Sequence, residues 1–234
     1  YNLGKKRDVV LIIEMSSFQL EYSKHVRPDH AILINITKDH LDWHGSMKNY
    51  TNAKLKIFSL QNKNNFAYIP NEEKIIKLFK KIKMKPSLQI NNLKTQNLIK
   101  KNIFNQYLLS KGNLENLSFI YHLIKHFKIS DKKFFSSLKN FRGLQHRQEI
   151  FLIKKNIYFI NDSKATTFEA AKACLINFKN IIWILGGLKK MGDDFNLDKI
   201  KDNVSKAFII GKDRSFFKSK INKKIIFKET INLK

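Results

Sequence analysis

Runs of hydrophobic residues alternate with amphipathic stretches along the chain. Val9 to Glu14 is a continuous apolar run that ends in an acid, and Ala31 to Ile36 is a second such run. Runs of this kind are typical of strands that are buried on both faces of a parallel sheet. The segment between them, Ser16 to Lys24, is compatible with a helix. The pattern therefore predicts a strand, a helix and a second strand.

The same alternation continues through the middle of the chain. Apolar residues on one face of Tyr50 to Leu60 predict an amphipathic helix. A short strand and three helices are predicted after it: Phe66 to Ile69, Glu72 to Lys83, Leu114 to Phe127 and Asp131 to Leu138. The Asn- and Lys-rich stretch from Lys85 to Lys111 has no clear period, so we assign no element to it.

The pattern changes after Phe141 to Leu144, which we interpret as a linker. A predicted hairpin follows, and then helices alternate with buried strands: Glu149 to Ile153, Ile157 to Asn161, Thr167 to Ile176, Ile181 to Leu185, Leu197 to Asn203 and Ala207 to Ile210. Such alternation predicts an α/β fold with parallel sheets. A chain of 234 residues is long enough for two domains, which we place at residues 1–144 and 145–234.

The net charge of +26 raises the alternative of a basic nucleic-acid-binding protein. However, only five of the 45 basic residues are arginine, the side chain that contacts phosphate and guanine bidentately. Lys, Asn, Ile and Phe are abundant while Gly, Pro and Arg are scarce, which follows A/T-rich codon usage. We therefore attribute the charge mainly to solvated faces and expect no nucleic-acid partner.

Cysteine content and hydropathy indicate the compartment. Cys174 is the only cysteine, which excludes an internal disulfide and fits a reducing compartment. No apolar run approaches the length that crosses a bilayer, and the first residues resemble neither a signal nor a transit peptide. We expect a cytoplasmic protein with no membrane partner.

Polar side chains follow both predicted strands near the start of the chain. Glu14 ends the first strand, and the turn from Lys38 to Gly45 after the second contains two acids and two imidazoles. The carboxyl ends of parallel strands face the ligand crevice, so these groups predict a metal or phosphate site. The structural alternatives are that Ser16 caps a helix after Glu14 and that Asp39 caps a helix in a polar loop.

The segment from Asn161 to Thr167 ends one predicted strand and begins a helix. Helix N-termini attract anions through free N–H groups and the macrodipole. Lys164, Thr166 and Thr167 would add a cation and hydroxyl groups for a phosphate or a carboxylate. Ser163 or Thr167 as a simple helix cap is the alternative, and both interpretations can hold together.

A Gly-rich loop, Gly186 to Phe195, follows another buried strand and contains the adjacent lysines Lys189 and Lys190. Glycine lets a backbone approach a ligand, and the lysines would hold a carboxylate. The loop is not a P-loop, because Asp193 stands where the P-loop lysine should be.

Arg147 lies at the predicted domain junction, within Gly143 to Glu149. An arginine there can bind phosphate bidentately from either side of the crevice. The alternative is a surface arginine that pairs with Glu149.

Taken together, these segments resemble the Mur ligase family. The residues that carry the resemblance are Glu14 to Leu20 (EMSSFQL), Asp39 to Gly45 (DHLDWHG), Gly143 to Glu149 (GLQHRQE) and Asn161 to Thr166 (NDSKAT). Their order and spacing match from about Val9 to Ile210. The NDSKAT run indicates the member that adds D-glutamate, because sister ligases carry a DYAH-like or DYNA-like sequence at this turn.

The resemblance implies a central ATP-binding domain followed by a Rossmann-like C-terminal domain, each present in part. It implies ATP-dependent ligation of D-glutamate to UDP-N-acetylmuramoyl-L-alanine through an acyl phosphate, with ATP and Mg²⁺ as cofactors. Such an enzyme serves peptidoglycan synthesis and cell-wall biogenesis, and so cell shape and division. The complete enzyme is expected to be a monomer.

The resemblance also implies roles for individual residues. It implies metal, catalytic, nucleotide and substrate contacts as follows: Glu14 and His40 as Mg²⁺ ligands; Lys54, His40 and Lys164 as catalytic residues, with Lys54 carbamylated; Asn113, Asn116, Arg147 and Asp162 at the nucleotide; and Thr166 and Lys190 at the incoming D-glutamate. Lys189 is nearly as good a candidate as Lys190. For Lys54 the alternative is an exposed helix lysine like Lys56.

The family pattern extends beyond both ends of the chain. A GTNGKT-like phosphate loop and a UDP-binding domain should precede Glu14, and a glutamate-binding motif should follow residue 234. We therefore expect this sequence to be a fragment, and the alternative is a non-catalytic remnant that keeps the fold. The upstream reading frame would distinguish the two.

Overall fold

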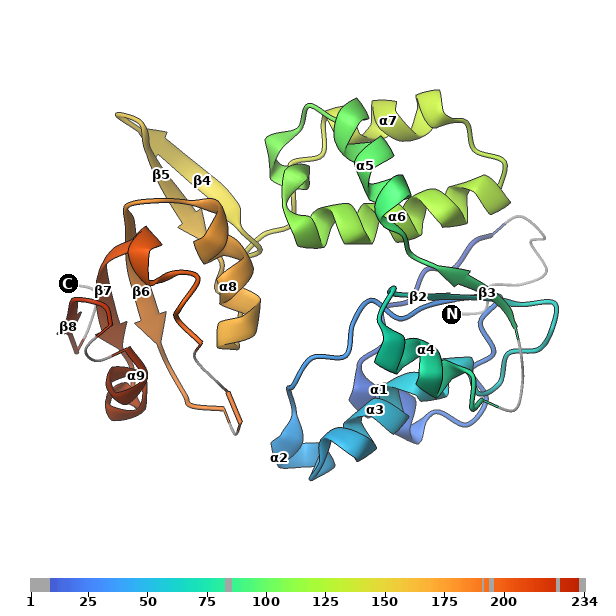
Figure 1. Cartoon of the computed structure of the whole chain (residues 1–234), viewed down its shortest axis with the longest axis horizontal. Helices are drawn as coiled ribbons and strands as arrows, with labels where there is room; N and C mark the ends of the chain where they lie inside the picture. Colours follow the sequence, from blue (N-terminus) through green and yellow to red (C-terminus); the bar gives the residue numbers. More distant parts are fainter. Residues whose placement is uncertain (1–8, 83–85, 191, 194–195, 222–223, 232–234) are drawn as a thin grey trace.

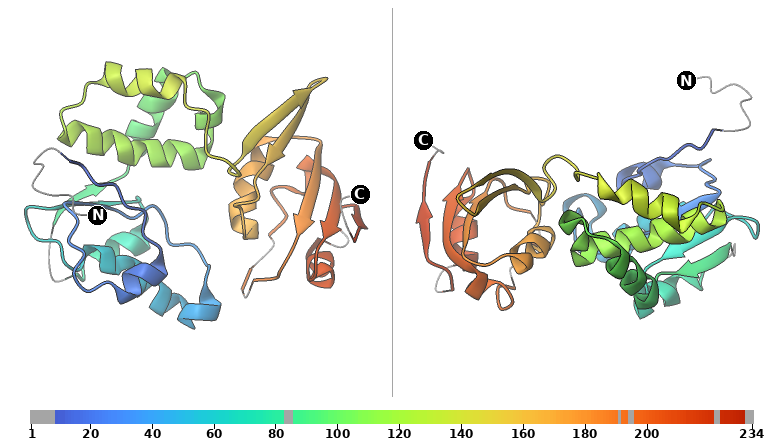
Figure 2. Two further views of the ribbon diagram at one scale, coloured as in Figure 1. Left: turned by 180° about the vertical axis from the view of Figure 1, so that it is seen from behind. Right: turned by 90° about the horizontal axis from the view of Figure 1, so that it is seen from above.

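The computed structural model describes residues 9–82, 86–190, 192–193, 196–221 and 224–231. Residues 9–140 form a first lobe and residues 149–231 a second lobe, which a linker of residues 141–148 joins (Figures 1 and 2). Within these described ranges, buried hydrophobic residues form three clusters, two in the first lobe and one in the second. The division into domains at residue 144 itself stays a prediction.

The first lobe contains a parallel sheet with the strand order β1-β2-β3. The strands are β1 (His30–Ile32), β2 (Phe66–Ile69) and β3 (Ser87–Ile90). One side of the sheet, the lower side in Figure 1, is covered by α1 (Ser17–Tyr22), α3 (Met47–Leu55), η1 (Lys56–Phe58) and α4 (Glu73–Phe79), with α2 (Leu41–His44) beside α3. Phe58 and Ile75 of these helices pack on Ala67 of the central strand.

A helical layer lies on the other side of this sheet (Figure 1). It contains α5 (Leu93–Asn102), η2 (Gln106–Leu109), α6 (Lys111–His126) and α7 (Asp131–Lys139), which share their own buried cluster. The unassigned stretch from Lys85 to Lys111 thus supplies β3, α5 and η2. Asn92 caps α5 by accepting a bond from Thr95 N–H at 2.8 Å, so an Asn-rich composition here reflects caps rather than disorder.

The strand predicted for Val9 to Glu14 is wrong. These residues belong to no strand, and Val9, Ile12 and Ile13 are 51%, 89% and 62% exposed. A strand exists only where a neighbour satisfies its backbone N–H and C=O groups, and none of the described strands pairs with this run. Apolar composition predicts a preference for burial, but it does not supply the partner. The Ala31 to Ile36 run is likewise shorter than predicted, because Ile34 is 49% exposed beyond the end of β1.

The second lobe combines a hairpin with a parallel sheet. The hairpin pairs β4 (Glu149–Lys154) with β5 (Ile157–Asn161), as predicted, and α8 (Phe168–Asn177) follows. The parallel sheet has the order β6-β7-β8, with β6 (Ile181–Gly186), β7 (Val204–Ile210) and β8 (Phe227–Glu229). The prediction stopped short of α9 (Arg214–Ile221) and β8.

The helix predicted from Leu197 to Asn203 is a turn followed by the short 3₁₀ segment η3 (Lys201–Asn203). Leu197 and Ile200 are both fully buried, and Ile200 N–H bonds to Leu197 C=O at 2.9 Å. An apolar pair three residues apart fits one tight turn as well as it fits an α-helix, and here the pair anchors the entry to β7.

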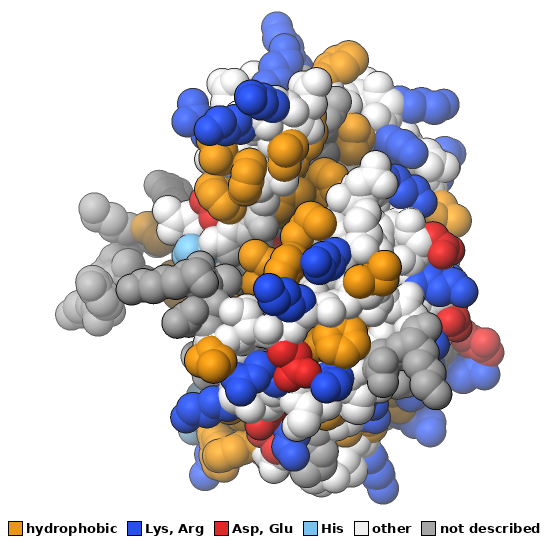
Figure 3. Space-filling model, turned by 90° about the vertical axis from the view of Figure 1, so that its left-hand side faces the viewer, with side chains coloured by type: hydrophobic (Ala, Val, Ile, Leu, Met, Phe, Trp, Pro, Cys, Tyr) orange, Lys and Arg blue, Asp and Glu red, His pale blue; other side chains and the backbone are white. Residues whose placement is uncertain are grey.

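Large hydrophobic side chains are exposed on both strands of the hairpin, among them Phe151, Ile153 and Ile157 at 61%, 57% and 59%. Figure 3, which views the side of the second lobe, shows hydrophobic groups among many lysines and arginines. Among the described residues, no helix combines the length and the apolar character needed to span a bilayer.

Candidate active site

Asp39 and His40 lie in the loop between β1 and α2. His40 has a left-handed backbone (φ 54), which turns the chain sharply before α2. Its N–H bonds to Asp39 Oδ1 at 2.8 Å, and its Nε2 lies 3.5 Å from Asp39 Oδ2. The residue that caps α2 is therefore His40 and not Asp39, and α2 has no side-chain cap bond. The Asp39 carboxylate does not cap the helix, and it also accepts a bond from Lys190 Nζ.

His44 has a structural role that the sequence does not reveal. It is 4% exposed, its Nε2 lies 3.0 Å from Ser17 Oγ, and its Nδ1 lies 3.5 Å from Glu21 Oε2 without hydrogen-bond geometry. Trp43 Nε1 donates to the same Glu21 oxygen at 3.0 Å. These contacts join α2 to α1, and both His44 nitrogens face residues of α1 rather than Asp39. The two acids and two imidazoles of this turn do not form a metal-binding cluster, since no three His, Cys, Asp or Glu side chains are grouped for a metal among the described residues.

Lys54, in the last turn of α3, is held close to this loop. Its Nζ donates to Asn35 C=O at 2.7 Å and lies 5.2 Å from the centre of the Tyr50 ring. Burial lowers the pKa of Lys54, and the negative charge of Asp39 opposes that shift. Lys54 is therefore half-buried and hydrogen-bonded, which differs from a freely exposed helix lysine.

Glu14 is exposed, and within the described residues its carboxylate makes no hydrogen bond or ion pair. The alternative interpretation of its segment is correct in part. Ser16 caps α1 in a capping box, since its Oγ accepts from Gln19 N–H at 3.2 Å and Gln19 Oε1 accepts from Ser16 N–H at 2.8 Å. The cap does not occupy Glu14, so its predicted metal role stays a prediction.

The end of the linker around Arg147 lies beside the segment around Asp162 in the second lobe. Asp162 Oδ1 accepts a bond from Gln148 N–H at 3.0 Å, and Lys164 N–H bonds to His146 C=O at 3.0 Å. Burial raises the pKa of Asp162, while the Gln148 N–H and the charge of Arg147 oppose the rise. The Lys164 and Arg147 side chains are exposed. Both cations are therefore available to a ligand.

Two structural alternatives in this region are settled. Thr167, and not Ser163, caps α8 through a 3.3 Å bond from Ala170 N–H. Glu149 accepts from His146 N–H at 2.9 Å, and no ion pair joins it to Arg147 in the described part of the chain.

The Gly-rich loop after β6 reaches from the second lobe to the first. Lys190 Nζ donates to Thr166 Oγ1 at 3.1 Å and to Asp39 Oδ1 at 3.0 Å. Gly192 packs so closely on Lys38 that an added Cβ would lie 2.5 Å from Lys38 Cε. The structure thus brings Thr166 and Lys190 together and places them against Asp39, while their roles in substrate binding stay predictions.

Only one of the two candidate lysines enters this contact. Lys189 has an exposed side chain, and its backbone N–H bonds to Asp213 Oδ2 at 2.8 Å. Asp193, for which the sequence predicted no role, accepts the Phe168 N–H at the start of α8 at 3.0 Å. Asp193, which stands where a P-loop would have its lysine, thus binds the backbone at the start of α8.

Asn113 and Asn116 lie near the start of α6. Asn113 Nδ2 donates to Tyr107 C=O at 2.7 Å, whereas Asn116 is exposed. Tyr107 also contacts Arg147, because its hydroxyl donates to Arg147 C=O at 2.9 Å. Sequence reasoning missed Tyr107, since it lies in the stretch without a clear period and in no motif.

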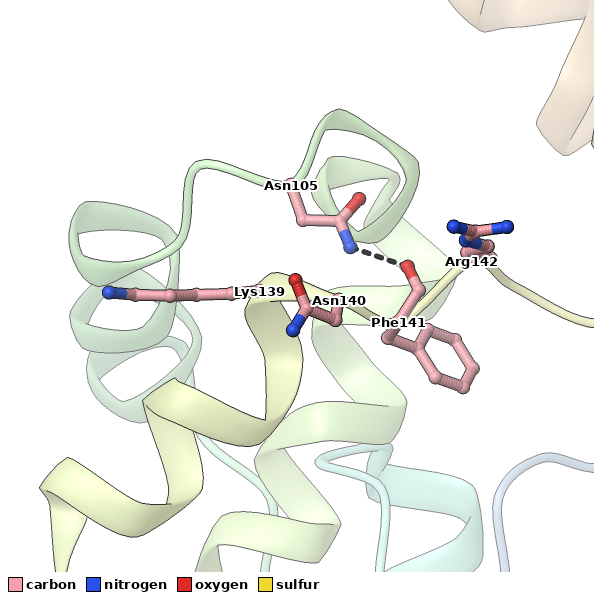
Figure 4. A pocket seen from close by; sticks show the side chains of 5 residues that line it. All are labelled: Asn105, Lys139, Asn140, Phe141 and Arg142. Atoms are coloured by element: carbon pink, nitrogen blue, oxygen red, sulfur yellow. Dashed lines mark hydrogen bonds between the residues drawn. The ribbon is translucent and has the colours of Figure 1, made fainter.

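Two pockets among the described residues are lined by none of these side chains. One of about 350 Å³ is lined by Asn105, Lys139, Asn140, Phe141 and Arg142 beside the linker (Figure 4), and the other lies along α7. We place the candidate active site at the contact between the lobes, because Lys190, the Asp39–His40 pair and the Thr166 hydroxyl group meet there. Such a site can bind phosphates and carboxylates.

Comparisons with known proteins agree on one family. The Mur ligase middle domain matches residues 1–130. The UDP-N-acetylmuramoylalanine–D-glutamate ligase of Natranaerobius thermophilus is 32% identical over 234 residues, covering 91% of this chain and 50% of that protein. The protein of the same name from Rickettsia felis is 32% identical over 224 residues, covering 88% and 50%. The chain thus spans about half the length of the curated relatives it matches.

Solved structures show the same fold at lower identity. The MurF ligase of Thermotoga maritima in complex with ADP matches 87% of this chain and 53% of its own, with a TM-score of 0.62 and 14% identity. The UDP-N-acetylmuramate–alanine ligase MurC of the same organism matches 92% and 53%, with a TM-score of 0.55 and 16% identity. The α/β fold predicted from the sequence is confirmed.

Proposed function

Because this chain belongs to the Mur ligase family, we propose that its protein uses ATP to ligate D-glutamate to UDP-N-acetylmuramoyl-L-alanine. The names of the relatives at 32% identity support this choice of substrates, as does the NDSKAT run from Asn161 to Thr166. The ADP in the related MurF structure supports ATP as the energy source. The reaction would serve peptidoglycan synthesis in the cytoplasm.

One observation carries the proposal: Lys190 binds Thr166 and Asp39 at once, and so joins three motifs that lie far apart in the sequence. An ammonium and a hydroxyl group beside each other form a suitable site for one carboxylate of D-glutamate. The Asp39–His40 loop on the opposite lobe lies next to that site, where the second reactant would be activated. A ligase must bring its two substrates together in this way.

In the proposed reaction, the carboxylate of the L-alanyl group attacks the γ-phosphorus of ATP, ADP leaves and an acyl phosphate forms. The neutral amine of D-glutamate attacks the acyl carbon, loses a proton, and the tetrahedral intermediate expels inorganic phosphate. The protein mainly positions the reactants and neutralises charge. Lys164 and Arg147 would contact the phosphates, and Asn113, Asn116 and Asp162 the rest of the nucleotide.

We propose that Mg²⁺ binds at this site only together with the nucleotide. The described residues contain no group of three His, Cys, Asp or Glu side chains placed to hold a metal ion. Mg²⁺ commonly uses one or two protein ligands and completes its shell with phosphate oxygens and water. Glu14 and His40 are the ligands we propose, and the ion would neutralise charge on the transferred phosphoryl group.

The test is a phosphate-release assay on the product of the complete reading frame, with mass spectrometry of the nucleotide product. We expect release that requires ATP, UDP-N-acetylmuramoyl-L-alanine and D-glutamate together, and no release with L-glutamate. Lys190→Ala should raise KM for D-glutamate at least ~10-fold, the loss expected for a charged hydrogen bond. The neighbouring Lys189→Ala is the matched control and should have little effect. Absence of product, or equal use of L-glutamate, would refute the proposal.

A further inference from the structure

Tyr107 lies where the first lobe meets the linker. It is part of η2, and its N–H bonds to Oδ1 of the capping residue Asn105 at 3.1 Å. Its half-buried ring packs against the cluster that α5, α6 and α7 share. Its hydroxyl group extends beyond that cluster to the linker, where it donates to Arg147 C=O at 2.9 Å and accepts from Leu144 N–H at 3.4 Å.

Gly143 is shaped to receive the ring of Tyr107. A Cβ at this position would lie 2.4 Å from Tyr107 Cζ and 2.6 Å from its Cε2, well inside any normal contact. The backbone of Gly143 also has φ +84, a conformation that favours glycine. Both the space and the backbone therefore require glycine, and the ring lies directly against the linker.

The other end of Tyr107 contacts the start of α6. Its backbone C=O accepts a bond from Asn113 Nδ2 at 2.7 Å. One residue thus bonds to Asn113 on the first lobe and to Arg147 at the end of the linker.

Asn105 secures the beginning of the same linker. Its Nδ2 donates to Leu138 C=O at 3.0 Å and to Phe141 C=O at 2.7 Å, the second of which is drawn in Figure 4. The linker is therefore held at Phe141 by Asn105, and at Leu144 and Arg147 by Tyr107. These hydrogen bonds to the first lobe fix the path of the linker.

We propose that Tyr107 is a positioning residue that fixes Arg147 relative to Asn113, so that both contact the same nucleotide. The inference rests on the proposed function, because the nucleotide roles of Asn113 and Arg147 do. Core packing alone does not account for the tyrosine, since phenylalanine would fill the same volume. The hydroxyl group is the part of the side chain that bonds to the linker.

Tyr107→Phe in the full protein removes that hydroxyl group and keeps the ring. We expect KM for ATP to rise ~2- to 12-fold, the effect of one hydrogen bond, with KM for D-glutamate and kcat changed less than about 2-fold. Hydrogen exchange of the 141–148 peptide should become several-fold faster, because the Leu144 N–H loses its partner. The exchange measurement reports on the linker independently of any activity.

Tyr121→Phe is the matched control. Tyr121 packs against the same helical cluster, with its ring 5.5 Å from that of Phe134, and it takes no part in the linker contacts described above. The same chemical change there should leave both KM for ATP and linker exchange unchanged.

Gly143→Ala provides a second route to the same interaction, because its methyl group would displace the Tyr107 ring. Adding Tyr107→Phe to Gly143→Ala should then produce little further rise in KM for ATP. Thermal unfolding of each variant shows whether the fold is retained.

Unchanged linker exchange in Tyr107→Phe would overturn the positioning role, whether or not the protein is a ligase. Faster exchange with unchanged KM for ATP would overturn the link to the nucleotide. If the unaltered protein has no ligase activity, the proposed function fails, and the same experiment with ATP binding in place of KM still decides the role of Tyr107.

Discussion

Replacing Gly186 with alanine tests how β6 ends against β7. Gly186 is paired with Ile210 in the parallel register, and Gly187 N–H bonds to Ile210 C=O at 3.2 Å. An added Cβ at Gly186 would lie 1.9 Å from the carbonyl oxygen of Ile210, and the backbone of Gly186 has φ +145. The methyl group would therefore collide with the backbone of the neighbouring strand, which cannot rotate away as a side chain can.

The magnitude follows from three costs. The strands must separate by about 1.5 Å to reach a normal contact, and the Gly187–Ile210 bond is then lost, which costs about 1 kcal/mol. Backbone strain adds about 1–3 kcal/mol, and the displaced packing about 1–3 kcal/mol more. Together these costs should lower the free energy of unfolding of the second lobe in Gly186→Ala by about 3–7 kcal/mol.

Urea unfolding followed by tryptophan fluorescence measures this change. The chain has two tryptophans, Trp43 in the first lobe and Trp183 on β6, so a Trp43→Phe background reports on the second lobe alone. The unfolding midpoint should fall by at least about 1 M urea, because the m-value of a small domain in urea is about 1–3 kcal/mol/M.

Two other glycines separate the contributions. Gly187 has φ +110 but no atom within 4 Å of an added Cβ, so Gly187→Ala should cost the strain alone. Gly112, in α6, has neither a contact within 4 Å nor a left-handed backbone, so Gly112→Ala should stabilise the first lobe by about 0.5–1 kcal/mol. If Gly186→Ala costs no more than Gly187→Ala, the reasoning from the collision with Ile210 is wrong.

Three further predictions concern charged groups. Burial, and next the charge of His126, lower the pKa of His30, so the folded state favours the neutral imidazole. The free energy of unfolding should therefore fall as the pH drops below about 6.5. Denaturation midpoints measured from pH 5 to 8 should show this fall, and it should be weaker in His126→Gln. The side chains of the Asp39–Lys190 pair are 22% and 32% exposed. A double-mutant cycle of unfolding should therefore give a coupling free energy of up to about 1 kcal/mol, and this coupling should weaken as salt is added. Strictly additive effects of the two substitutions would contradict the contact. Lys54→Ala should lower ligase activity sharply and recover partly with added acetate or formate if Lys54 functions as a carbamate; near-normal activity without added carboxylate would show that it does not.

The fold could be predicted where local pattern and available partners agreed. Phe66 to Ile69 and Val9 to Glu14 are both apolar runs, yet only the first is a strand, because β1 and β3 lie on either side of it. Sequence pattern reports the preference of a segment for burial and says nothing about its neighbours. The stretch around Asn92 and Asn105 was not assigned because polar caps interrupt the hydrophobic period of short helices.

The site shows the same limit. The family resemblance implies that Thr166 and Lys190 share one substrate site, and their side chains are hydrogen-bonded to each other. Their contact with Asp39 was not predicted, because a contact between lobes depends on the course of the linker. His44 was grouped with the site by its position in the motif, whereas its burial against Ser17 follows from the packing of two helices. Motif spacing identifies the loop, and packing decides which of its side chains face the ligand.

The exposed apolar hairpin β4–β5 affects how the protein behaves in solution. Copies of a chain with a net charge of +26 repel each other, and this repulsion keeps the hairpin edges of different molecules apart. Salt shortens the range of the repulsion to about 10 Å at 0.1 M and to about 3 Å at 1 M, while the attraction between apolar strands persists. Colloidal stability should therefore be greatest in dilute buffer, and self-association should increase as the ionic strength rises.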